Sequence, residues 1–302
     1  MTNGSRVRPR APYLFVAPAV LLFVAFLAVP IGYAIYLSSR GLRVTGKGIF
    51  GTREEVFVGL DNYVKTLTDS EFWAGFGRLA LYGLIAVPFT LGLALLFALL
   101  LDHAGSRAKR FSRTAIFLPY AVPGVTASLL WGFMYLPSTS PFSYVTRELG
   151  LGTIPFLGGG GIYPSLANIA VWGGVGFNMI IIYTSLRGIS PALYDSARID
   201  GASEWQIAWR IKIPLVAPAL VLTGLFALIG TLQVYSEPTT VRPMTTEISQ
   251  TWVPLMHIYR NAFLRDDLPL ASAASVLLAV GTLVISIVLL NITQKRAFGG
   301  ME

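Results

Sequence analysis

Six long stretches of this chain contain no charged residue, and this distribution constrains the fold more than any other feature. The stretches are Ala11–Ser39, Leu79–Leu101, Thr114–Thr146, Leu149–Leu186, Ile213–Ser236 and Leu268–Gln294. An α-helix rises about 1.5 Å per residue, so roughly 20 apolar residues cross a hydrocarbon core of about 30 Å. Each stretch is long enough for one crossing. The chain is therefore expected to cross a membrane six times.

The composition supports the same class, with 54% hydrophobic and only 13% charged residues. Transmembrane β-strands alternate in hydropathy over about ten residues, whereas these stretches are continuous apolar runs, so an all-α integral membrane protein is predicted. The first stretch is long and lacks a small-residue cleavage site, which favours a retained helix over a secretory signal. The predicted helices cover about residues 12–38, 79–101, 112–136, 164–186, 213–236 and 269–293.

Basic residues are denser on one set of connecting segments. The tail of residues 1–10, the link after the second helix, the segment after the fourth helix and the tail of residues 295–302 hold 13 of the 23 Lys and Arg. Because basic residues that flank spans favour the cytoplasmic side, both tails are expected to be cytoplasmic. Orientation and lipid headgroups, and not nucleic acid, then account for the net charge of +8.

The apolar stretches also lack histidine, so they offer no ionisable group at mid-membrane of the kind that ion-driven carriers generally need. Energy is therefore expected to enter from outside the membrane. Their uncharged polar and aromatic side chains suit a neutral polar solute such as a sugar. The alternative is helix-to-helix hydrogen bonding and interfacial aromatic belts. The predicted substrate path comprises Asn178, Gln233, Tyr235, Trp172 and Tyr183.

Residues 190–214, between the fourth and fifth helices, are predicted to form two short helices with a joint. Ser190 is a suitable N-cap with Pro191 at the first helical position, and Ser203 with Gln206 forms a capping box for the second piece. Gly201 is expected to end the first piece in a left-handed conformation. A rigid polar hook is therefore predicted at the membrane surface.

The hook carries a recognisable motif, Asp195-Ser-Ala-Arg-Ile-Asp-Gly-Ala202, followed by Ile211, Pro214 and Pro218. It resembles the coupling motif of the permease subunits of ATP-binding-cassette importers, which usually begins Glu-Ala-Ala. Asp195 and Ser196 are the departures, and they keep charge sign or size. The resemblance runs from about Tyr13 to Gln294.

Further segments look like the sugar-type branch of these permeases. They are Gly59–Tyr63, Leu118–Pro123, Trp131, Trp172, Gly176–Asn178, Tyr259 and Ala262–Phe263. The chain departs from that branch after the fifth helix, where Val241–Met244 replaces a Gly-rich turn, and after the third helix, where a Gly-Asn pattern is missing. Because those loops face the solute-binding protein in the family, the identity of the sugar is not predicted.

This resemblance implies a type I ABC importer permease fold over residues 11–294 and a transport subunit, not an enzyme, in a bacterial or archaeal cytoplasmic membrane. The resemblance implies a sugar-type solute, and a disaccharide, oligosaccharide, polyol or sugar phosphate would all fit it. Because the apolar stretches offer no cationic group for a phosphate, a neutral di- or oligosaccharide is expected. The implied partners are a second homologous permease subunit, a dimeric ATP-binding subunit that holds ATP and Mg, an extracytoplasmic solute-binding protein and membrane lipid. No cofactor, metal or catalytic residue is expected on this chain.

Within the hook, residues 194–214 would couple transport to the ATPase. The resemblance assigns this role to Asp195, Ser196, Ala197, Asp200, Gly201, Ala202 and Pro214. Two alternatives stay open. A secondary carrier or facilitator for a neutral polar solute would act as a single polypeptide, and a membrane enzyme would need convergent His, Cys or carboxylates, for which only Asp195 and Asp200 are suitable.

Overall fold

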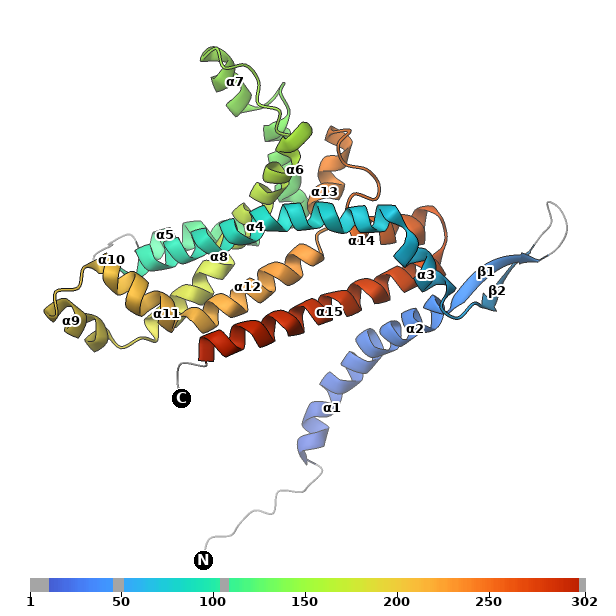
Figure 1. Ribbon diagram of the computed structural model, residues 1–302, viewed down its shortest axis with the longest axis horizontal. Helices are drawn as coiled ribbons and strands as arrows, with labels where there is room; N and C mark the ends of the chain where they lie inside the picture. The colour runs from blue at the N-terminus through green and yellow to red at the C-terminus, as the bar shows by residue number, and fades with distance from the viewer. Residues whose placement is uncertain (1–10, 46–51, 104–108, 299–302) are drawn as a thin grey trace, which may run out of the picture. The chain divides into compact units, whose positions relative to one another are not determined.

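The computed structural model describes residues 11–45, 52–103 and 109–298, and it is mainly helical (Figure 1). Its contacts divide the chain into two compact units, Met1–Asp69 with Ile258–Ala279 and Ser70–His257 with Val280–Glu302. Among the described residues, four helices are long and apolar enough to cross a membrane, and two bent helix pairs pass the same test. Counting each bent pair as one span gives six candidate spans, which is the number that the sequence predicts.

The first unit begins with one helical run made of α1 (Ala11–Phe23), η1 (Val24–Ala28) and α2 (Val29–Ser38). The most apolar window of this span has no residue buried inside the structure. Two antiparallel strands, β1 (Arg40–Thr45) and β2 (Thr52–Phe57), then form a hairpin that the sequence reading did not predict. The unit continues with α3 (Asp61–Thr68) and includes η6 (Arg260–Leu264) and the start of α15 (Leu268–Phe298).

The Gly59–Tyr63 segment ties α3 to the end of α2. The side-chain amide of Asn62 donates to the carbonyl oxygens of Ser38, at 3.0 Å, and Arg40, at 2.5 Å. The Tyr63 hydroxyl and Ser38 Oγ are 2.6 Å apart. The amide therefore satisfies carbonyl groups near a helix end, where intrahelical partners are missing.

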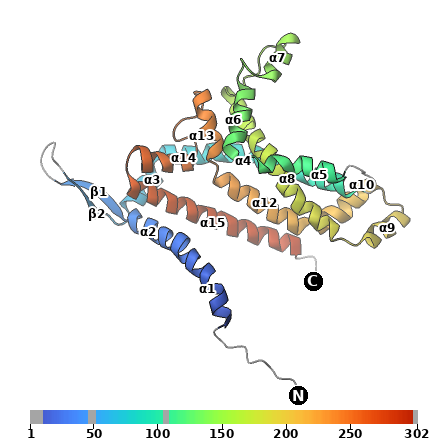
Figure 2. The same cartoon turned by 180° about the vertical axis from the view of Figure 1, so that it is seen from behind.

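The second unit is built on α4 (Ser70–Asp102), which packs along α8 (Ile162–Arg187), as Figures 1 and 2 show. The buried face of α4 repeats mostly every four residues: Leu79, Tyr82, Ala86, Thr90, Ala94, Ala98 and Leu101. Small residues on such a face let two helices approach closely. The helix begins earlier than the predicted 79–101, because Glu71 and Arg78 neutralise each other across 3.1 Å inside its first turns.

The third predicted span, 112–136, is broken. It consists of α5 (Lys109–Phe117), η2 (Leu118–Ala121) and α6 (Gly124–Tyr135), and the pair bends by 96°. Pro123 has no backbone N–H and disfavours the helical conformation at Val122, which is extended with ψ 126°. After α6 come α7 (Pro141–Glu148) and η3 (Gly159–Gly161), which lead into α8.

The fifth predicted span, 213–236, also differs. After α8 come α9 (Pro191–Ile199), α10 (Glu204–Ile207), η4 (Ala208–Lys212) and α11 (Ile213–Leu215), and the chain bends by 67° before α12 (Ala217–Leu232). The helix stops at Leu232 because a helix running through Pro238 would set its ring against the carbonyl of Val234. The chain restarts as α13 (Ser236–Val241), followed by η5 (Arg242–Met244) and α14 (Pro254–Tyr259).

Gly176 on α8 is a point of close backbone approach. A Cβ atom there would lie 2.7 Å from the Cα of Phe117 and closer still to the carbonyl oxygen of Ile116. We predict that Gly176→Ala forces α8 away from the α5–η2 corner and lowers stability by about 1–3 kcal/mol, a usual cost of overpacking. Thermal unfolding of the purified protein in detergent measures the change.

Gly173→Ala is the matched control, because a Cβ atom at that position on the same helix has nothing within 4 Å. An equal melting temperature for the two variants would show that the corner does not depend on this contact.

Candidate functional site

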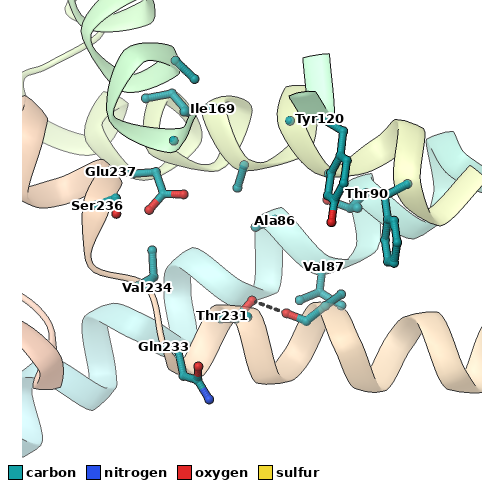
Figure 3. Close-up of a pocket in the computed structure, with 18 of the residues that line it drawn as sticks. Ala86, Val87, Thr90, Tyr120, Ile169, Thr231, Gln233, Val234, Ser236 and Glu237 are labelled. Atoms are coloured by element: carbon teal, nitrogen blue, oxygen red, sulfur yellow. Dashed lines mark hydrogen bonds between the residues drawn. The ribbon is translucent and has the colours of Figure 1, made fainter. Parts of the chain in front are cut away.

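A cavity of about 520 Å³ lies within the second unit, between α4, η2, α8, α12 and the start of α13 (Figure 3). Its wall is mixed apolar and polar. The polar and tyrosine side chains of the wall are Tyr82, Thr90, Tyr120, Asn178, Thr231, Gln233, Tyr235, Ser236 and Glu237. None of the lining residues, all of them in the described part of the chain, is Lys, Arg or His. The wall therefore offers many hydrogen-bonding groups and no positive charge.

Three residues of the predicted substrate path, Asn178, Gln233 and Tyr235, line this cavity. The Asn178 amide nitrogen donates to the Gly174 carbonyl at 2.8 Å, while its side-chain oxygen is buried without a protein partner. Asn178 is one of the cavity-lining residues, and the hydrogen-bonding capacity of its side-chain oxygen is unused within the described protein.

The other two predicted residues lie elsewhere. Trp172 packs edge to face on Trp131, with ring centroids 6.0 Å apart, and belongs to the border of the apolar core. Tyr183 lies beside Leu101 in a separate small pocket of about 190 Å³. Neither side chain is part of the lining of the 520 Å³ cavity.

Glu237 is the charged lining residue that the predicted substrate path does not include. It follows directly after the charge-free stretch that ends at Ser236. The helix breaks between α12 and α13, and the Glu237 side chain points into the cavity (Figure 3). Pro238, which prevents α12 from continuing, was the available signal. The predicted path also lacks Tyr82, Thr90, Tyr120, Thr231 and Ser236 of the wall.

The hook has the local structure predicted for it. Gly201 adopts φ +82°, a left-handed conformation that strains other residues, and a side chain there would meet nothing within 4 Å. The capping box of Ser203 and Gln206 is present with both hydrogen bonds. Ser190 occupies the N-cap position of α9, but its side chain makes no capping hydrogen bond.

Charged residues of the hook are paired with one another. Arg198 donates to Asp195 at 3.0 Å and to Glu204 at 2.9 Å, so it joins α9 to α10 across the Gly201 joint. The hydrogen bond from Arg198 lowers the pKa of Glu204. Asp195, predicted as a docking charge, is thus engaged within the hook. Three large apolar side chains are exposed beside this network: Ile199, Trp205 and Trp209.

One ion pair and one histidine–carboxylate contact join the hook to the end of α4. Lys212 Nζ lies 2.6 Å from Asp102 Oδ2, and His103 Nδ1 lies 3.5 Å from Glu204 Oε2. The Lys212 ammonium also sits 4.8 Å from the centre of the Tyr194 ring. Burial raises the pKa of Tyr194. No sequence signal pointed to these contacts, because Lys212 and Asp102 are 110 residues apart.

An apolar helix bundle with a hydrogen-bonding cavity and a charged hook at one end fits a membrane transport component. A family described as "Binding-protein-dependent transport system inner membrane component" matches residues 91–296, more than half of the chain. The chain belongs to this family. It is a transport permease subunit, and its relatives are transport permeases as well, which favours this class over the secondary-carrier and enzyme alternatives.

Curated relatives cover nearly the whole chain. The sn-glycerol-3-phosphate transport system permease protein UgpA of Agrobacterium fabrum (strain C58 / ATCC 33970) is 30% identical over 293 residues, which cover 96% of each chain. UgpA of Escherichia coli (strain UTI89 / UPEC) is 29% identical over 289 residues, which cover 94% of each. The chain is therefore similar in length and family to permeases of solute import systems.

Solved structures share the fold. One is a bacterial ABC transporter involved in the import of the acidic polysaccharide alginate, with a TM-score of 0.79 and 23% identity over 94% of this chain and 95% of that one. The same kind of transporter in complex with an alginate pentasaccharide-bound periplasmic protein gives a TM-score of 0.82 and 22% identity, with 95% of both chains covered. These likenesses show the fold of an ABC importer permease.

Proposed function

We propose that this chain forms one half of the membrane channel of an ATP-driven importer, with a second homologous permease as the other half. A solute-binding protein would deliver the solute, and a separate dimeric subunit would bind ATP and Mg. The observation that carries the proposal is the pairing of a polar cavity with a rigid hook in one unit of the chain. The cavity would hold the solute, and the hook would receive the ATPase.

The hook has the features of a docking element. Its two short helices are joined at the left-handed Gly201 and are linked by the Arg198 bridge. Ile199 is 86% exposed, and both hook tryptophans are also exposed. Exposed large apolar groups around paired charges are typical of a surface that binds a partner protein. In this proposal Ala197 and Ala202 keep the motif narrow enough to enter a groove on the ATPase, and Asp195 and Asp200 cap or pair within that interface. Pro214 sets the entry to the following span.

The contacts of the hook also support the proposed orientation. The end of α4 and the hook, both rich in nearby Lys and Arg, meet through the Asp102–Lys212 pair. Two basic segments therefore belong to the same end of the unit, as expected for one cytoplasmic face. In this orientation both tails are cytoplasmic, and the α7 region faces outward.

Single cysteines test the orientation, since the chain contains no cysteine of its own. We predict that a membrane-impermeant maleimide labels Leu151→Cys, an exposed position after α7, in intact spheroplasts. The same reagent should label Ile199→Cys in the hook only in inside-out vesicles washed free of peripheral subunits. Labelling of Ile199→Cys in intact spheroplasts would contradict the proposed orientation.

We further propose that the solute is a neutral di- or oligosaccharide. The relatives are named for an anion, sn-glycerol-3-phosphate, and the similar solved transporter is described as importing an acidic polysaccharide. The cavity has no cationic lining residue that could pair with an anion, and its acidic lining residue is Glu237, whose ionised form would repel one. Glu237, Asn178 and Gln233 can instead bond sugar hydroxyls, and the Tyr120 ring, stacked on Phe177 at 4.9 Å, offers an apolar face.

Removing the Glu237 charge tests this assignment. We predict that Glu237→Gln weakens transport of a neutral disaccharide about 10- to 100-fold, because a hydrogen bond to a charged group contributes about 1.5–3 kcal/mol. Uptake is measured in the complete assembly with the binding protein saturated by solute, so that the change reports the membrane step.

Thr223→Val is the control on α12, because the Thr223 hydroxyl is bonded to the backbone of its own helix and lies outside the cavity lining. It should transport like the unmodified protein. Preferential uptake of a phosphorylated or uronic-acid sugar by the unmodified assembly would overturn the neutral-sugar assignment.

A further inference from the structure

The ion pair between Lys212 and Asp102 is much more buried than the other ion pairs among the described residues of the second unit. The two charged atoms are 2.6 Å apart, and the side chains are only 7% and 5% exposed. Lys212 belongs to the last turn of the hook, and Asp102 is the last residue of α4. The pair therefore connects a segment outside the membrane spans to the end of a spanning helix.

The position of Asp102 is unfavourable without this partner. The C-terminal end of an α-helix carries a partial negative charge, so a carboxylate there is repelled, and no basic residue occupies the last turn of α4. Burial adds the cost of removing two charges from water, which their mutual attraction only partly offsets. A buried pair of this kind is weak evidence for a stabilising role, which favours a role in the motion of the hook.

Lys212 contacts three elements at once. It sits in η4, a five-residue π-helical turn, and such turns are frequent at functional sites. Its ammonium pairs with Asp102 on α4 and lies over the buried ring of Tyr194 on α9. A displacement of α9 would therefore act on Lys212, and through Lys212 on α4.

A second, more exposed link runs in parallel. His103 follows α4 directly and pairs with Glu204 at 3.5 Å. Glu204 accepts the hydrogen bond of Arg198, which also holds Asp195. The motif residues of the hook are in this way connected to the end of α4 through side chains alone. Figure 1 shows α10 beside that end.

α4 carries the connection to the cavity. From Asp102 the helix runs back through Leu101, Ala98 and Ala94, which pack on Met179, Ile182 and Leu186 of α8. It reaches the cavity wall at Thr90, about 18 Å away at 1.5 Å per residue, and continues through Val87, Ala86 and Tyr82. A shift of its end would therefore move the cavity wall with it.

We propose that Asp102 and Lys212 are positioning residues of the transport cycle, which make the hook and α4 move as one body. Force applied at the hook by the ATPase then reaches the cavity wall. This inference rests on the proposed function, because it requires that an ATPase acts on the hook. The residues touch neither nucleotide nor solute, and their effect is on the coupling between the two.

The test uses the complete assembly, reconstituted with its partner permease, ATPase and binding protein. We expect Asp102→Asn and Lys212→Met to insert and assemble, to hydrolyse ATP, and to move about tenfold fewer solute molecules per ATP than the unmodified protein. The exchanged pair, Asp102→Lys with Lys212→Asp, should recover part of this ratio. Arg113→Gln, which removes an exposed charge from α5, should leave the ratio unchanged.

A pull-down of the ATPase separates coupling from folding. If the single variants fail to assemble with the ATPase and the exchanged pair does not restore assembly, the ion pair has only a structural role and the proposal is overturned. A normal ratio of solute to ATP in both single variants would overturn it equally. If the unmodified assembly itself shows no ATP-driven transport, the proposed function fails, and this result is distinct from the other two.

Discussion

The cost of placing a charge in hydrocarbon governs the whole arrangement. A charged side chain at the centre of a spanning helix costs about 2.5–3.5 kcal/mol on insertion scales, and the six apolar stretches carry none. The charges are therefore left for the ends of the helices and the connections, where they pair with one another. The hook is one of the connections that hold these charged residues. The Asp102–Lys212 pair lies at the boundary between the apolar spans and the polar connections.

The same constraint explains where the helices break. Non-helical backbone at membrane depth is tolerated only where it is buried in protein or lines a water-filled cavity. The corner at Leu118–Pro123 and the break at residues 233–235 both border the 520 Å³ cavity, and each places polar groups there, Tyr120 from one and Gln233 with Glu237 from the other. The breaks in the two bent spans thus supply hydrogen-bonding groups to the wall of the cavity.

Local signals in the sequence were sufficient to predict the local structure of the hook. The capping box at Ser203 and the left-handed Gly201 depend on neighbouring residues only, and both are present. Trp172 and Tyr183 lie at least about 120° from Asn178 around α8 at 100° per residue, so helical periodicity could have separated them from the lining. The place of Glu237 in the cavity wall could not be predicted from helical periodicity, because it depends on the helix break between α12 and α13. The Asp102–Lys212 pair could not be predicted either, because it joins distant segments of the chain. The β1–β2 hairpin was likewise not predicted from the pattern of charges.

Uptake into proteoliposomes is the most direct test of the central claim, that this chain moves solute only when an ATPase drives its hook. Vesicles would hold the chain alone or the complete assembly with ATP inside, and accumulation of a labelled disaccharide delivered by the binding protein would be measured. The account predicts accumulation by the complete assembly, abolished when ATP is omitted, and none by the chain alone. Uptake by the chain alone, or ATP-independent uptake by the assembly, would contradict it.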